Sequence, residues 1–217
     1  MSRELDVQRE VARIALASAG DCGFALAGSG AIREHGIIDR PTQDVDLFTT
    51  TAHVEQVERA AERAAAELRS AGYHVEEVTK SPSFTRLQVR SGDAHSLEVD
   101  FAIDWRKSDP VMLNVGPVLS LEDAIANKVS ALYSRGEPRD YLDVDAIRGT
   151  GRFTDEELLG AAAERDPGFE TGMFADQLDA SRHITPRDVR MYGVDDDQLE
   201  LIKERMGQWA RQIRTPR

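Results

Sequence analysis

The spacing of hydrophobic residues changes once along the chain, near residue 115. Before that point, short segments in which apolar and polar residues alternate stand between amphipathic segments with helical spacing. After it, only the helical spacing continues. This pattern predicts an α/β fold, with a small mixed β-sheet core and flanking helices in residues 1–115. We expect residues 116–217 to form a C-terminal helical domain.

Within the first region, helical spacing predicts helices over residues 4–18 and 53–71, the second ending before Gly72. A short helix is expected over GAIREHG, with Gly36 as its end. The expected strands, in chain order, are FALAGSG (24–30, running into a turn), DVDLFTT (44–50), YHVEEVT (73–79), SFTRLQVRS (83–91) and HSLEVDFAID (95–104).

The second region carries repeated signals for helix starts. Ser120 precedes the segment LEDAIANKVSALYSRG, and a proline stands near the start of EPRDYLDVDAIRG, where a helix tolerates it. Thr154 with Glu157, and Thr185 with Asp188, predict two further starts. A last helix is expected from about residue 197 to 213.

Composition and charge narrow the possible functions. The net charge of −12 argues against a protein that coats nucleic acid, because phosphate affinity comes largely from lysine and arginine. It leaves room for an enzyme that touches one end of a nucleic acid through a local basic patch. The single cysteine, Cys22, excludes an intramolecular disulfide, and no apolar run reaches membrane-spanning length. We therefore expect a cytoplasmic protein without a membrane partner.

Two acids stand in the predicted strand DVDLFTT, where acids are disfavoured. Residues i and i+2 of a strand point to the same face, so Asp44 and Asp46 bring two negative charges close together. That arrangement is unfavourable unless a cation lies between them. A second DVD at residues 143–145 is a useful control: in a helix the same spacing diverges, so the same letters cannot make the same site.

Neighbouring residues extend this pair to a candidate phosphate-transfer site. The Gly28-Ser29 turn offers a bare backbone and a hydroxyl that could cradle a phosphate. Asp100 interrupts an apolar strand and could close the acidic cluster, although Glu98 and Asp104 share its strand face and either could be the third acid. Three acids on one sheet face can hold two Mg²⁺ ions about 4 Å apart, which suits phosphoryl-type transfer. The five histidines show no zinc pattern.

Together these residues resemble a known superfamily. A GS turn, a DxD strand and a later acidic strand are similar to the polymerase-β-type nucleotidyltransferases. The segments LAGSGAIREHGIIDRPTQDVDLFT and NKVSALYSRGEPRDYLDVDAI more specifically resemble the AbiEii/MenT-type nucleotidyltransferase toxins of bacterial toxin–antitoxin systems. The spacing from Gly28-Ser29 to Asp44 is longer than in many polymerase-β-type enzymes.

The resemblance implies transfer of a nucleotide from a nucleoside triphosphate to an acceptor hydroxyl. It implies that Asp44, Asp46 and Asp100 bind Mg²⁺, and that Gly28, Ser29, Arg40 and Thr42 contact the nucleotide. Lys128 matches the family lysine that approaches the phosphates, and Asp143 matches a second family acid that orients Lys128 or the acceptor. We expect the acceptor to be the 3′ end of tRNA, which would block aminoacylation and translation, and a cognate antitoxin is a possible partner.

Three hypotheses follow from these observations. The first is the tRNA-directed toxin, aided by a local basic lip of Lys128, Arg135, Arg139, Arg148 and Arg152. The second is a nucleotidyltransferase acting on a small molecule such as an aminoglycoside, or on a protein side chain, because an acidic surface suits a cationic acceptor. The third is a non-catalytic interaction module on the same fold; the intact acid pair argues against it.

Overall fold

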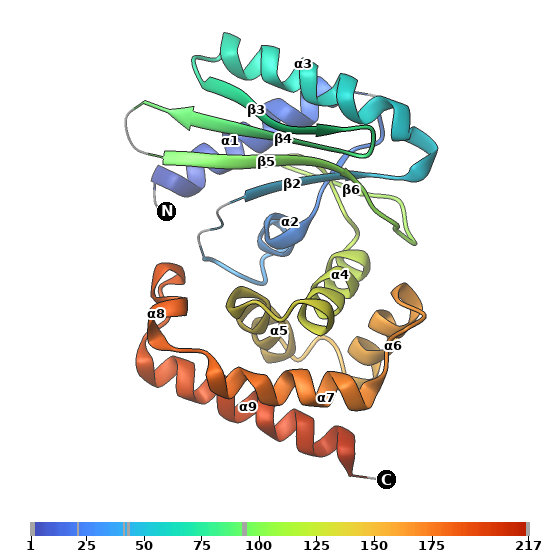
Figure 1. Ribbon diagram of the computed structural model, residues 1–217, viewed down its shortest axis with the longest axis vertical. Helices are drawn as coiled ribbons and strands as arrows, with labels where there is room; N and C mark the ends of the chain where they lie inside the picture. The colour runs from blue at the N-terminus through green and yellow to red at the C-terminus, as the bar shows by residue number, and fades with distance from the viewer. Residues whose placement is uncertain (1–2, 21, 41, 43, 93–94, 216–217) are drawn as a thin grey trace. The chain divides into compact units, whose positions relative to one another are not determined.

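The computed structural model describes residues 3–20, 22–40, 42, 44–92 and 95–215 (Figure 1). They fall into two compact units, which we describe separately. The first is an α/β unit that comprises residues 1–35 and 41–121, and the second is a helical unit that comprises residues 36–40 and 122–217. Across the described residues, no helix is both long and apolar enough to cross a membrane.

The α/β unit contains a mixed sheet with the strand order β3-β4-β5-β2-β1-β7-β6. Strands β2 and β5 pair in parallel, as do β1 and β7, and the other neighbours are antiparallel. The strands are β1 (Ala25–Leu26), β2 (Asp44–Thr49), β3 (His74–Ser81), β4 (Phe84–Ser91), β5 (His95–Ile103), β6 (Val111–Leu113) and β7 (Gly116–Val118). The predicted mixed sheet with flanking helices is confirmed.

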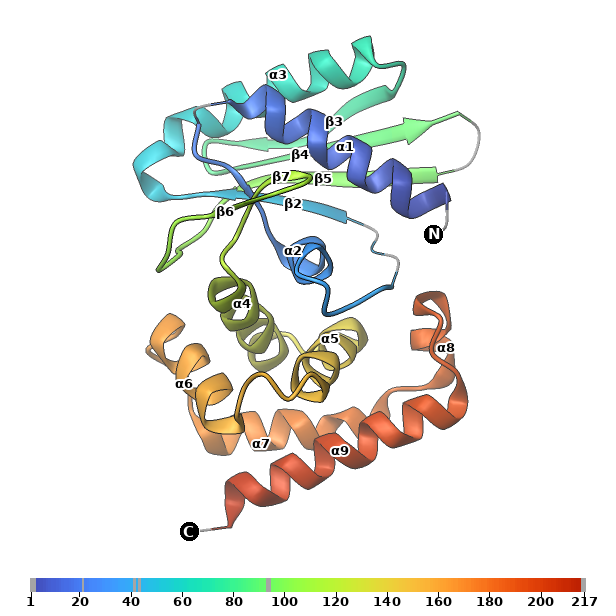
Figure 2. The same cartoon turned by 180° about the vertical axis from the view of Figure 1, so that it is seen from behind.

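Helices α1 (Arg3–Ala19) and α3 (Val57–Ser70) cover one face of this sheet (Figure 2). They pack on each other, and α3 also contacts β3, β4 and β5. Four alanines of α3 are almost fully buried: Ala60, Ala61, Ala64 and Ala65. Their small side chains allow this face of α3 to pack closely, while the opposite face of the helix is exposed. A 3₁₀ segment, η1 (Thr51–Gln56), precedes α3, and a short helix, α2 (Gly28–Glu34), follows β1.

The helical unit contains α4 (Leu121–Ser134), α5 (Pro138–Gly149), α6 (Asp155–Arg165), α7 (Thr171–Asp179), α8 (Pro186–Val189) and α9 (Asp196–Arg214), with the 3₁₀ segments η2 (Ala180–His183) and η3 (Arg190–Tyr192). Helices α7 and α9 lie side by side (Figures 1 and 2). Trp209 of α9 is buried and packs edge-on against Phe174 of α7, with ring centroids 5.2 Å apart.

Most predicted helix ends are confirmed, because they depend on local chemistry. Thr154 with Glu157 and Thr185 with Asp188 form capping boxes that begin α6 and α8, and Pro138 is the first residue of α5. The β6–β7 hairpin was not predicted, and its second strand contradicts the expectation of helices alone after about residue 115. Its strands have only three residues each, too few for alternation to be visible in the sequence.

The expected strand FALAGSG is also shorter than predicted. Only Ala25 and Leu26 pair as a strand, and helix α2 begins at Gly28 rather than at Gly30. The backbone of Gly28 has φ +55, a left-handed conformation that favours glycine and turns the chain sharply out of the sheet.

Candidate active site

The parallel pairing of β2 with β5 places four acids on one face of the sheet. Asp44 is the register partner of Glu98, and Asp46 is the register partner of Asp100. Register partners on neighbouring strands share a face, as do residues two apart on one strand. The apolar residues between the acids are buried on the opposite face. The sequence-based prediction that Asp44 and Asp46 share a face is therefore confirmed.

The first residue of helix α2 lies directly against one of these acids. A Cβ atom added to Gly28 would lie 1.8 Å from Oδ2 of Asp46, and the backbone N–H of Ala27 donates a hydrogen bond to the carbonyl of Asp46 at 2.8 Å. Ser29 follows and is only 4% exposed. The turn from β1 into α2 thus brings a bare backbone beside a carboxylate, as the sequence predicted for Gly28 and Asp46.

This contact gives a first prediction. Gly28→Ala should destabilise the protein by roughly 1–2 kcal/mol, because a side chain is strained at φ +55. It should also impair nucleotide transfer, because the new methyl group must push the Asp46 carboxylate aside. Urea unfolding and the rate of transfer measure the two effects.

Gly36 provides the matched control. Its φ is +75 and an added Cβ would meet nothing within 4 Å, so Gly36→Ala carries the backbone strain alone. We expect Gly36→Ala to lower stability while activity per folded molecule stays unchanged. Equal losses of activity in the two variants would show that contact with Asp46 is not the cause.

Of the three candidates for a third acid, Asp100 lies opposite Asp46. It is 7% exposed, and its two oxygens accept hydrogen bonds from Nε and Nη2 of Arg86, both at 2.7 Å. Glu98 is partly exposed and forms an ion pair with Nη1 of Arg86 at 2.8 Å. Asp104 lies beyond the end of β5, where its carboxylate accepts a hydrogen bond from the backbone of Trp105. The sheet register thus favours Asp100 and places Asp104 outside the paired rows.

Arg86 of β4 is a site residue that sequence reasoning missed. It is the register partner of Asp100 in the antiparallel β4–β5 pair. Hydrogen bonding to Asp100, together with the negative charges of Asp100, Glu98 and Asp44, raises the pKa of Arg86 above its ordinary value. The sequence contained a signal for this pair. Arg86 and Asp100 are equally far in sequence from residue 93, between the two predicted strands, so a symmetric hairpin makes them register partners.

The chemistry of this face suits a divalent cation. Carboxylate oxygens are the preferred protein ligands of Mg²⁺, and Asp44, Asp46 and Asp100 supply them from one sheet face. Among the described residues, no group of three Asp, Glu, His or Cys side chains is placed so that it could hold a metal ion. The carboxylate of Asp100 is held by Arg86. The three-acid magnesium site remains a prediction.

The remaining predicted residues of the helical unit form a buried ion-pair network. Arg40 donates from Nε and Nη2 to the two oxygens of Asp143, both at 2.7 Å, and Nζ of Lys128 lies 2.9 Å from Oδ2 of Asp143. Lys128 also lies 3.5 Å from Asp140, which Arg135 holds with two hydrogen bonds. Burial would raise the pKa of Asp140, but the hydrogen bonds from Arg135 and the charge of Lys128 lower it below its ordinary value.

The guanidinium of Arg40 also lies over the ring of Tyr192, 4.9 Å from its centroid. Thr42 belongs to the α/β unit, is 8% exposed, and its hydroxyl donates a hydrogen bond to the carbonyl of Asp44 at 3.2 Å. Its own carbonyl accepts a hydrogen bond from Gln8. The predicted contacts of Arg40 and Thr42 with a nucleotide remain predictions.

The second DVD sequence behaves as the control required. Asp143 is fully buried against Arg40 and Lys128, whereas Asp145 forms an ion pair with Arg205 at 2.6 Å near the surface. The two acids therefore serve different partners, which confirms that this copy in a helix does not repeat the arrangement in β2.

The structure does not support a basic lip beside Lys128. Most of the cations proposed for it lie in ion pairs: Lys128 with Asp143, Arg135 with Asp140, Arg139 with Glu137 and Arg148 with Asp155. Their charges are balanced locally. Sequence proximity suggested a positive patch because it did not pair the arginines with the matching acids, which lie two to seven residues from them.

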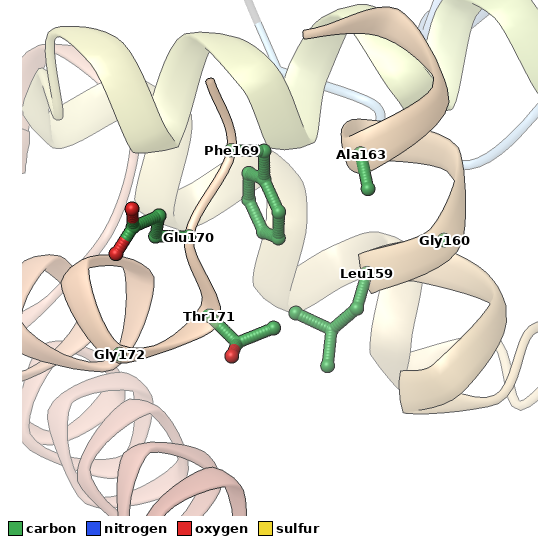
Figure 3. A pocket seen from close by; sticks show the side chains of 7 residues that line it. All are labelled: Leu159, Gly160, Ala163, Phe169, Glu170, Thr171 and Gly172. Carbon is green, nitrogen blue, oxygen red and sulfur yellow. The ribbon is translucent and has the colours of Figure 1, made fainter. Parts of the chain in front are cut away.

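A hollow of about 470 Å³ lies in the helical unit between α6 and the start of α7 (Figure 3). Apolar and small residues line most of it, and the carboxylate of Glu170 points away from Phe169 and Leu159. Its lining is Leu159, Gly160, Ala163, Phe169, Glu170, Thr171 and Gly172. None of the predicted site residues contributes to it, so we assign it no part in the chemistry.

Comparison with solved structures shows that other proteins share this fold. The structure of JHP933 from Helicobacter pylori has a TM-score of 0.64 at 17% sequence identity, covering 98% of this chain and 93% of that one. MenT4, a nucleotidyltransferase toxin from Mycobacterium tuberculosis H37Rv, has a TM-score of 0.61 at 17% identity, covering 96% and 84%. At 17% identity, these two matches show a shared fold.

The family follows from the sequence comparison. The family described as "Nucleotidyl transferase AbiEii toxin, Type IV TA system" matches residues 11–215. The chain belongs to this family, and the resemblance seen in its motifs is confirmed. No curated protein matches the sequence.

Proposed function

We propose that this toxin transfers a nucleotide from a nucleoside triphosphate to the 3′-hydroxyl of tRNA, in the cytoplasm and with Mg²⁺ bound. The acceptor oxygen forms a bond to the α-phosphorus, the bond to the bridging oxygen breaks, and pyrophosphate leaves while the hydroxyl loses its proton. A capped 3′ end cannot be aminoacylated, so translation stops.

The chain's own residues have distinct parts in this proposal. Asp44 and Asp46 hold the Mg²⁺, which supplies charge neutralisation at the phosphates. Asp100 completes the acidic set or accepts the proton of the acceptor hydroxyl. Gly28 and Ser29, at the turn into α2, bind the triphosphate. Thr42, which precedes β2, contributes to nucleotide binding.

In the helical unit, Asp143 holds Lys128 and Arg40 as cations. We propose that Lys128 offsets phosphate charge and that Arg40 contributes to nucleotide binding, as the family resemblance implies. Both side chains are at least nine-tenths buried among their partners, so their positions are fixed before a substrate arrives.

One observation supports this proposal above the others: Gly28 packs against the carboxylate of Asp46 on a strand that carries two acids on one face. A non-catalytic interaction module has no need for a left-handed glycine at that contact. A toxin of this family also implies a cognate antitoxin, which we propose as its protein partner.

The acceptor is tested with total tRNA, α-labelled triphosphates and Mg²⁺. We expect the label to appear on tRNA and to be lost when the 3′ end is first oxidised with periodate, which destroys the acceptor diol. Pyrophosphate release should match the label incorporated. Equal labelling of intact and oxidised tRNA would contradict the 3′ end as the acceptor, and no labelling of any RNA would remove tRNA from the proposal.

A cationic small molecule is the second candidate acceptor, and one observation favours it. Lys128, Arg135, Arg139 and Arg148 are balanced by acids, so these four residues form no positive patch that would offset the net charge of −12. Pyrophosphate release that depends on an added aminoglycoside, with no label on tRNA, would establish this alternative.

A further inference from the structure

Arg86 interacts with the acidic face far more strongly than an ordinary surface arginine does. All three of its terminal nitrogens are engaged, two with Asp100 at 2.7 Å and one with Glu98 at 2.8 Å. Its side chain is 34% exposed and that of Asp100 is 10% exposed. Paired, charge-assisted hydrogen bonds of this kind are among the strongest in proteins.

Arg90 provides the contrast on the same strand. It lies four residues further along β4, so its side chain points to the same face. Its ion pair with Glu76 is 3.3 Å long, and both side chains are about half exposed. Exposed pairs of that kind contribute little. The engagement of Arg86 is therefore a property of its position opposite Asp100 and not of the strand.

The charges on this face make the position of Arg86 important. Two rows of acids run across the sheet, Asp44 with Glu98 and Asp46 with Asp100, and Arg86 bridges both acids of β5. It also feels the charge of Asp44. A divalent cation that used Asp100 as a ligand would compete with the guanidinium for the same two oxygens.

We propose that Arg86 is a positioning residue that competes with the divalent cation for Asp100 and thereby sets the cation affinity of the site. This inference rests on the proposed function, because it assumes a cation bound by the β2 and β5 acids. Arg86 holds the carboxylate of Asp100 in one orientation and balances the repulsion among the acids. A cation gains Asp100 as a ligand only by displacing the guanidinium.

Titration of the full-length protein with Mn²⁺, followed by electron paramagnetic resonance of the free ion, tests this inference. We expect Arg86→Gln to bind Mn²⁺ about tenfold more tightly than the wild type, because a competing charged double hydrogen bond is removed. Arg86→Lys keeps the charge without the two-pronged geometry and should lie between them. Arg90→Gln should bind Mn²⁺ as the wild type does.

Unfolding in urea provides a second readout. With EDTA present, Arg86→Gln should be less stable than the wild type, and Mn²⁺ should stabilise it more than it stabilises the wild type. A purely structural role would lower stability and leave Mn²⁺ affinity unchanged or weaker, and that result would overturn the inference. If the wild type and all variants bind no Mn²⁺, the proposed metal site itself fails and the inference fails with it.

Discussion

Asp46→Asn should lower the rate of nucleotide transfer by about 10²–10³-fold or more, because it removes a charged ligand of the proposed Mg²⁺, and the Mg²⁺ would neutralise charge on the reacting phosphates. Asn has nearly the shape of Asp, so the contact with Gly28 remains. Asp46 faces like charges at Asp44 and Asp100, so its neutralisation relieves repulsion. We expect the variant to stay folded, because Asn keeps the size of Asp and an oxygen that accepts hydrogen bonds. Loss of activity without loss of stability is the characteristic of a functional acid.

Asp145→Asn is the matched control, since Asp145 ends the second copy of the same tripeptide. Its ion pair with Arg205 lies apart from the β2 acids, so its loss should leave the chemistry unchanged. Single-turnover assays with labelled nucleotide should show normal transfer by Asp145→Asn. We expect Asp46→Asn to lose far more than about tenfold in activity. If it retained more than about a tenth of wild-type activity, the proposed catalytic role of the β2 acids would be wrong.

Asp143→Asn should destabilise the helical unit by about 3–5 kcal/mol, because it leaves the buried cations Arg40 and Lys128 without their shared counter-charge. The side chain of Asp143 is fully buried, so water cannot reach this position to solvate the two cations. This is the largest stability effect that we expect from any single substitution proposed for this chain.

The chain offers a selective probe for this measurement. Trp209 is buried in α9 of the helical unit, and Trp105 is half exposed in the α/β unit. In a Trp105→Phe background, urea unfolding followed by tryptophan fluorescence reports the helical unit. Asp145→Asn in the same background should lower the free energy of unfolding by less than Asp143→Asn does, because its partner Arg205 is about half exposed and water can solvate it. Equal shifts for the two variants would contradict the buried network.

What the sequence predicted well was determined by local chemistry. The alternation in β2 and β5 placed the acids opposite the apolar residues, and threonine caps marked the starts of α6 and α8. Asp44 and Asp46 could be assigned to one face from strand geometry alone. Gly28 was singled out as a turn residue, and its left-handed backbone gives the physical reason.

What the sequence did not reveal depends on pairing between distant residues. Arg40 and Asp143 are 103 positions apart, and no periodicity links them. Arg86 reaches Asp100 only through the β4–β5 register, which must be counted from the turn. The expected basic lip was wrong because charges close in the sequence were counted without the acids that balance them. Hairpin β6–β7 was missed because its strands are very short.

The most direct test of the account is a crystal structure of the protein with Mn²⁺ and a non-hydrolysable nucleoside triphosphate, recorded with anomalous scattering. We predict a manganese peak within about 2.0–2.3 Å of carboxylate oxygens of both Asp44 and Asp46, with the triphosphate beside Gly28 and Ser29. A bound nucleotide whose metal lies away from these two carboxylates would contradict the account.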